Sequence, residues 1–474
     1  MIRRLVLSLA ALLLVLGAVR PATLQAQAGK PRVLTHWDTV ARDLFRELIE
    51  INTQESNGST LAAAEAMAKH LKAAGFPDAD VTVLSNAPRK GNLIARLRGK
   101  KLGKKPVLLL SHIDVVEAKP EDWTLPPYTF IEKDTTFYGR GVSDDKDDGA
   151  IHLALIMRLK AEKFVPDRDI IVALTTDEEG GPANGVDWLI KNHRDLIDAE
   201  FAFNEGGGGR VKNGKKLSHD IQASEKKVQN FQLEATNPGG HSSRPVKDNA
   251  IYELAAALTA IGTYDFPVHL NDITRTYFER SAAITEGPIG PAMKALVANP
   301  KDVAAAALIS SDPSYNSQLR TSCVATMLDG GHALNALPQR ARGFVNCRIL
   351  PDENPDSIQA QLQRLAGDKV KVTKTRGVAE NSPPSIAAGQ VMAEIERATK
   401  DMWPGVAVIP TMSTGATDGR FLRSSGIPTY GVSGQFYGDS NAHGMNEHIP
   451  QRGFYEAGEF MYRLMKSLTG SPIS

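Results

Sequence analysis

Residues 108–114 are Leu108-Leu109-Leu110-Ser111-His112-Ile113-Asp114, an apolar run that ends in a histidine and an aspartate. A short, unbroken apolar run of this kind is typical of a strand buried on both faces of a parallel sheet. A second such run, Ile170–Thr175, follows a helical apolar pattern over 149–161. Helix and strand patterns alternate along this part of the chain. The sequence therefore predicts an α/β domain with a mostly parallel sheet.

The pattern changes near Lys226, where strands and helices are predicted in the order β-α-β-β-α-β. The six segments are 228–235, 250–261, 322–328, 343–349, 357–365 and 370–375. This order is the ferredoxin-like one, and α/β patterns return after it. We therefore predict an inserted α+β domain over residues 226–377, between two parts of the α/β domain at 29–225 and 378–474.

Composition and charge are those of an ordinary folded protein. The 474 residues include 55 Lys and Arg against 54 Asp and Glu, and 42% are hydrophobic. This balance provides no strong field to attract nucleic acid, so we expect no nucleic-acid partner. The only two cysteines, Cys323 and Cys347, lie on strands predicted to face each other. A cross-strand disulfide and two buried thiols both fit this arrangement, and we hypothesise that the cysteines pair.

The N-terminus has the features of a targeting segment. Arg3 and Arg4 precede an apolar run over 5–19, and Ala26-Gln27-Ala28 offers the small residues of a cleavage site. We predict a signal peptide over residues 1–28 and a secreted or periplasmic, bacterial protein with no membrane span after cleavage. A membrane anchor is the alternative, but the run is shorter than the ~20 residues that a span needs.

Histidines and acids follow several predicted strands and turns. They are His112 and Asp114, Asp144 and Asp145, Asp177 to Glu179, Glu205, and His443. Each alone has a plain structural explanation, such as a helix cap for the paired aspartates. Together they fall at predicted carboxyl ends of strands, where ligands gather in such sheets. Histidine and carboxylate without cysteine suit Zn²⁺, Co²⁺ or Mn²⁺, and a charge count supports two ions.

The chain resembles metallopeptidase family M-20 in a set of motifs that occur in the family's order. They are HID at 112–114, GRGVSDDK at 139–146, TDEEGG at 176–181, NEGG at 204–207, GGHSSRP at 239–245, NALP at 335–338 and the late His443. The resemblance implies a zinc-exopeptidase-like α/β catalytic domain with an inserted ferredoxin-like lid domain. It also implies a homodimer formed through the lid.

The resemblance assigns the metal ligands residue by residue. It implies that one zinc ion is held by His112, Asp144 and Glu205. The other would be held by Asp144, Glu179 and His443, so that Asp144 bridges the two ions.

Further roles are implied for residues beside the ligands. Glu178 would be the general base, and Asp114 would orient His112. The peptide bond between Asp144 and Asp145 would be cis. The chain departs from the family at Asp147, which stands where members usually have glycine. We expect this extra acid to affect the local turn or the metal potential without removing a ligand.

One further catalytic residue, His241, and three substrate-binding residues are matched to positions of the family. His241 would reach the oxyanion of the reaction, and Asn335 would polarise the substrate. Arg348 would bind the free carboxylate of the substrate, and Thr417 belongs to a loop beside it.

The sequence thus predicts a secreted dinuclear zinc hydrolase for small substrates with a free carboxylate, of carboxypeptidase or dipeptidase type. An N-acyl amino acid amidohydrolase is the alternative, because EDWTLPPY at 121–128 and the long insertion at 264–319 resemble the carboxypeptidase S branch. A non-catalytic metal or peptide binder is an alternative of another class. The presence of Glu178 with all five ligand positions disfavours it.

Overall fold

The computed structural model of the chain describes residues 32–100, 103–375 and 382–470. The predicted signal peptide lies outside the described residues. Across the segments that are described, no helix is both long enough and apolar enough to cross a membrane. From Leu34 onward the chain clusters as one unit.

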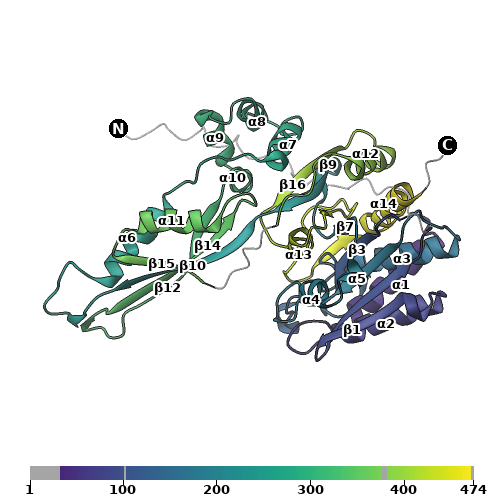
Figure 1. The fold of residues 1–474 in the computed structure, drawn as a ribbon, viewed down its shortest axis with the longest axis horizontal. Helices are drawn as coiled ribbons and strands as arrows, with labels where there is room; N and C mark the ends of the chain where they lie inside the picture. Colours follow the sequence, from purple (N-terminus) through teal and green to yellow (C-terminus); the bar gives the residue numbers. More distant parts are fainter. Residues whose placement is uncertain (1–31, 101–102, 376–381, 471–474) are drawn as a thin grey trace, which may run out of the picture. The chain divides into compact units, whose positions relative to one another are not determined.

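A mixed sheet, to which the described residues contribute nine strands, forms the centre of the α/β domain (Figure 1). In spatial order the strands are β1 (Val81–Ala87), β2 (Lys90–Leu97), β6 (Ile170–Thr175), β3 (Val107–His112), β7 (Phe201–Asn204), β17 (Thr429–Gly431), β9 (Lys215–Glu225) and β16 (Ala407–Ser413), with β8 (Gly208–Lys212) paired to β9. Strands β6, β3, β7 and β17 are mutually parallel. The predicted parallel centre is therefore confirmed, and β1 and β2 join it antiparallel.

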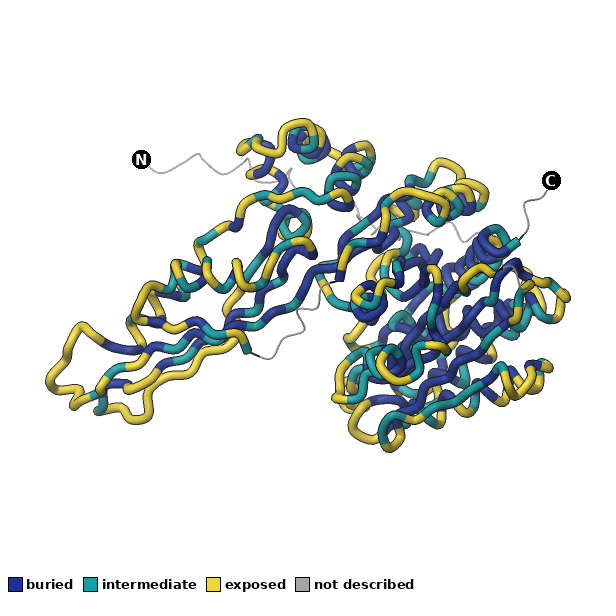
Figure 2. Tube along the Cα trace, viewed as in Figure 1, coloured by how far each residue is buried: buried dark blue, intermediate teal, exposed yellow. Residues whose placement is uncertain are grey.

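Helices cover both faces of this sheet (Figure 1). One face carries α1 (His36–Glu50), α2 (Thr60–Ala73), α3 (Lys146–Ala161), α12 (Gln390–Met402) and α14 (Gln451–Thr469); the other carries α4 (Gly185–Asn192), α5 (Arg194–Ile197) and α13 (Gly419–Ser424). Leu109 of β3 clusters with the first set, whereas Leu108 and Leu110 cluster with the second. Successive strand residues point to opposite faces, so a doubly covered strand needs an unbroken apolar run. Figure 2 shows the buried interior that results.

A buried lysine joins the start of α3 to the end of α1. Lys146 Nζ donates hydrogen bonds to the carbonyl oxygens of Leu48, at 2.8 Å, and Ile51, at 3.0 Å. The last carbonyls of a helix have no partner within the helix, so this amine satisfies groups that burial would otherwise leave unpaired. Burial lowers the pKa of Lys146 to about 7. The contact fixes the segment that precedes α3, where Asp144 and Asp145 lie.

The inserted domain has the β-α-β-β-α-β order that the sequence predicts. Its elements are β10 (Lys227–Thr236), α6 (Ala250–Gly262), β12 (Ser322–Gly330), β14 (Arg340–Ile349), α11 (Pro355–Ala366) and β15 (Val370–Lys374). The strands pair antiparallel in the order β12-β14-β10-β15, and α6 and α11 pack on the sheet (Figure 1). A short ribbon pairs β11 (Gly240–His241) with β13 (Ala336–Leu337).

Two further groups of elements complete the described chain. Helices α7 (Asp272–Ser281), α8 (Ile289–Ala298), α9 (Val303–Ser310) and α10 (Pro313–Leu319) pack in an apolar cluster that includes Ile409 of β16. The helices of the long insertion therefore contact the large sheet. A small sheet joins β4 (Ile131–Lys133), β5 (Thr136–Tyr138) and β18 (His448–Pro450), and 3-10 turns cover Asp78–Asp80 and Pro120–Asp122.

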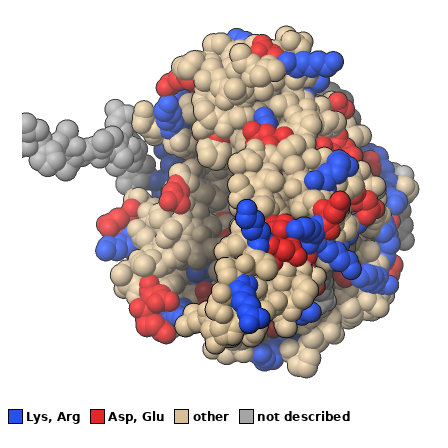
Figure 3. Space-filling model, turned by 90° about the vertical axis from the view of Figure 1, so that its left-hand side faces the viewer, with Lys and Arg blue, Asp and Glu red and all other residues tan. Residues whose placement is uncertain are grey.

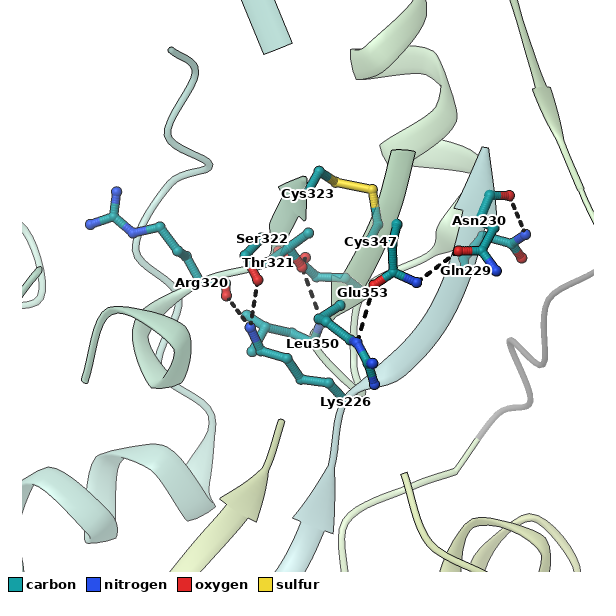
Figure 4. Close-up of a disulfide and its surroundings, with 12 residues drawn as sticks. Lys226, Gln229, Asn230, Arg320, Thr321, Ser322, Cys323, Cys347, Leu350 and Glu353 are labelled. Carbon is teal, nitrogen blue, oxygen red and sulfur yellow. Dashed lines mark hydrogen bonds between the residues drawn. A yellow bond between two sulfur atoms is a disulfide. The ribbon is translucent and has the colours of Figure 1, made fainter. Parts of the chain in front are cut away.

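The two cysteines form the disulfide that we hypothesised. Cys323 of β12 lies directly opposite Cys347 of β14, and the S–S distance is 2.00 Å (Figure 4). The bond closes a loop between residues 24 apart and ties the edge strand of the lid sheet to its neighbour.

We predict that replacing both cysteines by serine lowers the free energy of unfolding by about 3 kcal/mol, because the unfolded chain regains the entropy of an open loop. Denaturant unfolding without reductant measures this difference. Unreduced wild-type protein should show no free thiol after unfolding, and equal midpoints for the two proteins would contradict the prediction.

The core histidine His219 of β9 is neutral. Its side chain is fully buried among Trp403, Phe436 and Phe460, and Nδ1 lies 2.8 Å from the hydroxyl of Thr399. Burial lowers the pKa of His219 to about 3.

We predict that this residue makes the protein less stable as pH falls from about 6.5 to about 3, since only the unfolded chain binds the proton there. His219→Gln should reduce the slope of unfolding free energy against pH by about 1.4 kcal/mol per pH unit. Denaturant midpoints across this range test the claim, and parallel curves for the two proteins would refute it.

Candidate metal centre

The carboxyl ends of three neighbouring parallel strands bring the predicted ligands together. His112 is the last residue of β3, Glu205 directly follows β7, and Glu179 lies in the loop after β6. Strand order in this part of the sheet is β6-β3-β7, so the three side chains start from adjacent positions. Asp144 precedes α3, and His443 comes from the loop before β18.

Five side chains form two groups with one shared member. The ligand atoms of His112, Asp144 and Glu205 all lie within 4.8 Å of one another, as do those of Asp144, Glu179 and His443. Asp144 Oδ1 is 2.9 Å from His112 Nε2, and its Oδ2 is 3.0 Å from His443 Nε2. His443 Nε2 is also 3.0 Å from Glu179 Oε1. The predicted ligands are thus adjacent, and their binding of metal remains a prediction.

The chemistry of these groups fits divalent cations. Burial raises the pKa of Glu205 well above its usual range, and among the described residues buried Glu205 Oε1 has no hydrogen-bond partner. Hydrogen bonds with Asp144 and Glu179 raise the pKa of His443 to about 10. Protons in this cluster balance the crowded carboxylates, and bound cations would do the same. The donor set of imidazole and carboxylate suits zinc.

Glu178, the predicted general base, lies beside the ligands with its pKa raised to about 8. Burial is the main cause, and the nearby carboxylates of Asp418 and Glu179 add to it. The backbone N–H groups of Glu178 and Glu179 donate to the carboxylate of Asp114, at 3.1 and 3.0 Å. Asp114 therefore holds the loop that carries both glutamates. A base with a pKa near neutrality is suited to accept and return a proton.

Asp114 also contacts His112, mainly through its backbone carbonyl. His112 Nδ1 is 3.1 Å from the backbone carbonyl oxygen of Asp114 and 3.6 Å from its carboxylate. The carbonyl is the nearer partner, and it leaves Nε2 free to face Asp144. Such a contact fixes the ring of a ligating histidine.

The peptide between Asp144 and Asp145 is cis, as the resemblance implies. The carboxylate of Asp145 accepts the backbone N–H of His112 at 3.2 Å. Asp147 is buried and accepts a hydrogen bond from Gln435 Nε2. Asp147 belongs to neither ligand group, so the extra acid adds no ligand to them.

A buried ion pair that the sequence motifs did not reveal positions the loop of His443. Arg140 Nη1 donates to Glu447 at 2.7 Å, and Arg140 Nη2 donates to the carbonyl of His443 at 3.2 Å. The Glu447 carboxylate also accepts the backbone N–H groups of Gly141 and Ser143. These contacts join the two loops that supply Asp144 and His443. Arg140 occurs inside the quoted GRGVSDDK motif, whereas Glu447 lies four residues after His443.

A cavity of about 340 Å³ opens beside the candidate centre. It lies between the loops after β3 and β6, and its lining includes Glu179, Asp114, Val115 and Gly181. This cavity offers room for part of a small molecule next to Glu179.

The predicted lid residues His241 and Asn335 lie together on the β11–β13 ribbon. The Ser242 N–H donates to the carbonyl of Asn335 at 3.0 Å, and both predicted residues are exposed. His241 Nδ1 is 2.8 Å from the Ser243 hydroxyl. Within the described chain, none of the hydrogen bonds of His241 reaches the two ligand groups.

Arg348 and Thr417 occupy different environments. Arg348 Nη1 donates to the carbonyl of Thr414 at 3.3 Å, and among the described residues no carboxylate lies within ion-pair distance of its guanidinium. Burial lowers the pKa of Arg348. The N–H and hydroxyl of Thr417 both donate to Glu225, at 2.8 and 3.1 Å. The hydroxyl of Thr417 is thus engaged within the protein, whereas Arg348 retains an unpaired charge.

The sequence profile of peptidase family M20/M25/M40 matches residues 108–467. The chain belongs to this family. Members are hydrolases of peptide or amide bonds, and this chain is an enzyme of that kind.

Two relatives of this chain carry names that state different activities. The human N-fatty-acyl-amino acid synthase/hydrolase PM20D1 is 26% identical over 388 residues, which cover 78% of this chain and 76% of the relative. A probable carboxypeptidase S-like 2 from Dictyostelium discoideum is 26% identical over 403 residues, covering 83% and 77%.

A solved structure supports the fold. An M20 family metallo-carboxypeptidase from Sulfolobus solfataricus superposes with a TM-score of 0.67 at 19% identity, covering 90% of this chain and 98% of the other. The predicted α/β class of the M20 fold is therefore confirmed.

We predict that Asp144→Ala reduces metal binding at both positions, because Asp144 belongs to both ligand groups. His443→Ala should empty only one position, since His443 belongs to one group. Metal content per chain after dialysis, measured by mass spectrometry, distinguishes the two. Equal losses in the two variants would contradict a shared bridging ligand.

Proposed function

We propose that this chain is a dinuclear zinc hydrolase that cleaves amide bonds in small substrates bearing a free carboxylate. The observation that carries the proposal is the pair of ligand groups sharing Asp144, with Glu178 beside them. The proposed ligands are His112, Asp144, Glu179, Glu205 and His443. Co²⁺ and Mn²⁺ suit the same donors.

Glu178 would carry the proton in this reaction. When bound, zinc supplies polarisation of the scissile carbonyl and a more acidic water. Glu178 would accept the proton of the attacking water and return it to the leaving amine. Its position beside the two ligand groups places it where this proton transfer would occur. Asp114 would keep the loop of Glu178 in place through the two backbone hydrogen bonds.

Arg348 would set the requirement for a carboxylate. Its guanidinium is half-buried and has no carboxylate partner among the described residues, so a substrate carboxylate could pair with it in two parallel hydrogen bonds. Binding of a terminal carboxylate favours an exopeptidase, of carboxypeptidase or dipeptidase type. His241 and Asn335 would contact the reacting carbonyl group, and Thr417 would support the substrate loop through Glu225.

An N-acyl amino acid amidohydrolase is the second candidate. The named activity of PM20D1 favours it, whereas the carboxypeptidase S-like relative and the solved carboxypeptidase favour the first. Both candidates release an amino acid with a free carboxylate. They differ in the group on the other side of the scissile bond.

Export and dimer formation complete the proposal. The disulfide between Cys323 and Cys347 supports a secreted or periplasmic location, because such bonds persist in oxidising compartments. Edge strand β12 exposes Val324, Met327 and Leu328, which supports a dimer through the lid domain (Figure 2).

Basic and acidic side chains intermingle on the face shown in Figure 3, which fits a small-molecule substrate better than nucleic acid.

We predict that Glu178→Gln lowers kcat by at least ~10²-fold on dipeptides or N-acyl amino acids while metal content stays unchanged, since the proton carrier is lost. A chelator should abolish wild-type turnover, and added Zn²⁺ or Co²⁺ should restore it. The exposed Glu121→Gln serves as the matched control and should keep full activity. Metal-loaded wild type without turnover on any substrate would instead favour a non-catalytic binder.

A further inference from the structure

Lys226 is the single residue that connects a strand of the large sheet to a strand of the lid sheet. Strand β9 of the large sheet ends at Glu225, and strand β10 of the lid sheet begins at Lys227. Although lysine is rarely buried, the side chain of Lys226 is only 1% exposed (Figure 4). A buried charged group at a chain crossing calls for a physical explanation.

The amine of Lys226 binds another chain crossing between the same two parts. Its Nζ donates to the carbonyl of Arg320 at 2.7 Å and to the hydroxyl of Ser322 at 3.4 Å (Figure 4). These residues connect α10, which packs with β16, to strand β12 of the lid. No carboxylate within the described residues forms an ion pair with Lys226, and burial lowers its pKa to about 7. One side chain therefore joins two segments that are 94 residues apart in sequence.

The backbone around Lys226 holds the proposed substrate loop. The Lys226 N–H donates to the carbonyl of Ser413 at 2.9 Å. The preceding carboxylate, that of Glu225, binds Thr417 and also pairs with the buried Arg423. Both ends of the segment from Ser413 to Thr417 are thus attached to residues 225 and 226.

Arg348 lies between these contacts. In the lid sheet it is opposite Val228 on one side and Ser322, a partner of the Lys226 amine, on the other. Its guanidinium donates to the carbonyl of Thr414, within the loop that Lys226 and Glu225 hold. Arg348 Nε also donates to Asn346 Oδ1 at 3.2 Å, within the same strand. Arg348 thus contacts both attachments, the β12 start that Lys226 Nζ binds and the loop that the Lys226 N–H binds.

We propose that Lys226 is a positioning residue for Arg348, fixing the guanidinium in the orientation that binds the substrate carboxylate. The inference rests on the proposed function, in which Arg348 makes that contact. Removing the Lys226 amine frees the start of β12 and leaves the ligands of the metal centre untouched. The effect should therefore fall on recognition of the carboxylate and not on the chemical step.

Lys226→Met, which keeps most of the unbranched side chain but removes its donors, tests this proposal. The measured quantity is the ratio of kcat/KM for an N-acyl amino acid or dipeptide to that for its C-terminal carboxamide. We expect this ratio to fall about tenfold or more, through a higher KM for the acid with kcat changed less than about threefold. The double variant Lys226→Met/Arg348→Met should be no worse than Arg348→Met alone, because the two residues act through one contact.

Lys227→Met is the matched control. Lys227 is the next residue, is also buried, and donates to a backbone carbonyl, that of Glu353 at 2.9 Å. Within the described residues its amine donates no hydrogen bond to the residues that join α10 to β12, so its ratio should remain that of wild type. If Lys226→Met does not fold, Lys226→Leu, which also lacks a donor, is measured in the same way and the same fall in the ratio is expected.

Distinct results separate failure of this inference from failure of the proposed function. The inference would be overturned, and the proposed function kept, if Arg348→Met lost the carboxylate preference and the Lys226 variants did not. Additive losses in the double variant would have the same meaning. A preference that survives Arg348→Met would overturn the proposed carboxylate contact and the inference with it. If wild type turns over no substrate, calorimetric binding of the amino acid against its amide gives the same comparison.

Discussion

Four carboxylates, those of Asp144, Glu178, Glu179 and Glu205, converge at the carboxyl ends of β6, β3 and β7 and the start of α3. Like charges at this distance repel strongly in a buried setting, so protons or cations must be present to keep them together. Two histidines contact different oxygens of the Asp144 carboxylate: His112 contacts Oδ1, and His443 contacts Oδ2. The rest of the structure can be understood as what holds these groups in place.

Buried polar contacts hold the loops of the centre. The Asp114 carboxylate accepts a backbone N–H of the Glu178 loop, and the Asp145 carboxylate accepts the backbone N–H of His112. The ion pair of Arg140 and Glu447 joins the loops of Asp144 and His443. Lys146 ties the same region to α1. A buried ion pair is weak evidence for stability, because desolvation offsets much of its attraction. In this protein such pairs occur where a loop must be held in one conformation.

The inserted domain is joined to the large sheet by a second polar network. Glu225 and Lys226 bind the segment after β16, and the Lys226 amine binds the start of β12. Asp418, at the end of that segment, accepts a hydrogen bond from Asn184, which also donates to the carbonyl of Asp177 in the Glu178 loop. Contacts thus run from the lid sheet to the candidate base. In the proposed function, this network would set the distance between a substrate carboxylate bound at Arg348 and Glu178, and so which amide bond is cleaved.

Local patterns in the sequence were enough for the α/β class and the β-α-β-β-α-β insertion, and the resemblance to the M-20 motifs assigned the five residues that cluster. Apolar runs reveal strands, and acids or histidines placed after parallel strands must meet at one edge of a sheet. The roles of Arg140 with Glu447, of the Asp114 carbonyl and of Lys226 appeared only in the tertiary structure. Arg140 and Glu447 are 307 residues apart, and Lys226 and Arg320 are 94 apart. Such partners depend on how loops and side chains are oriented after folding, which spacing along the chain does not specify.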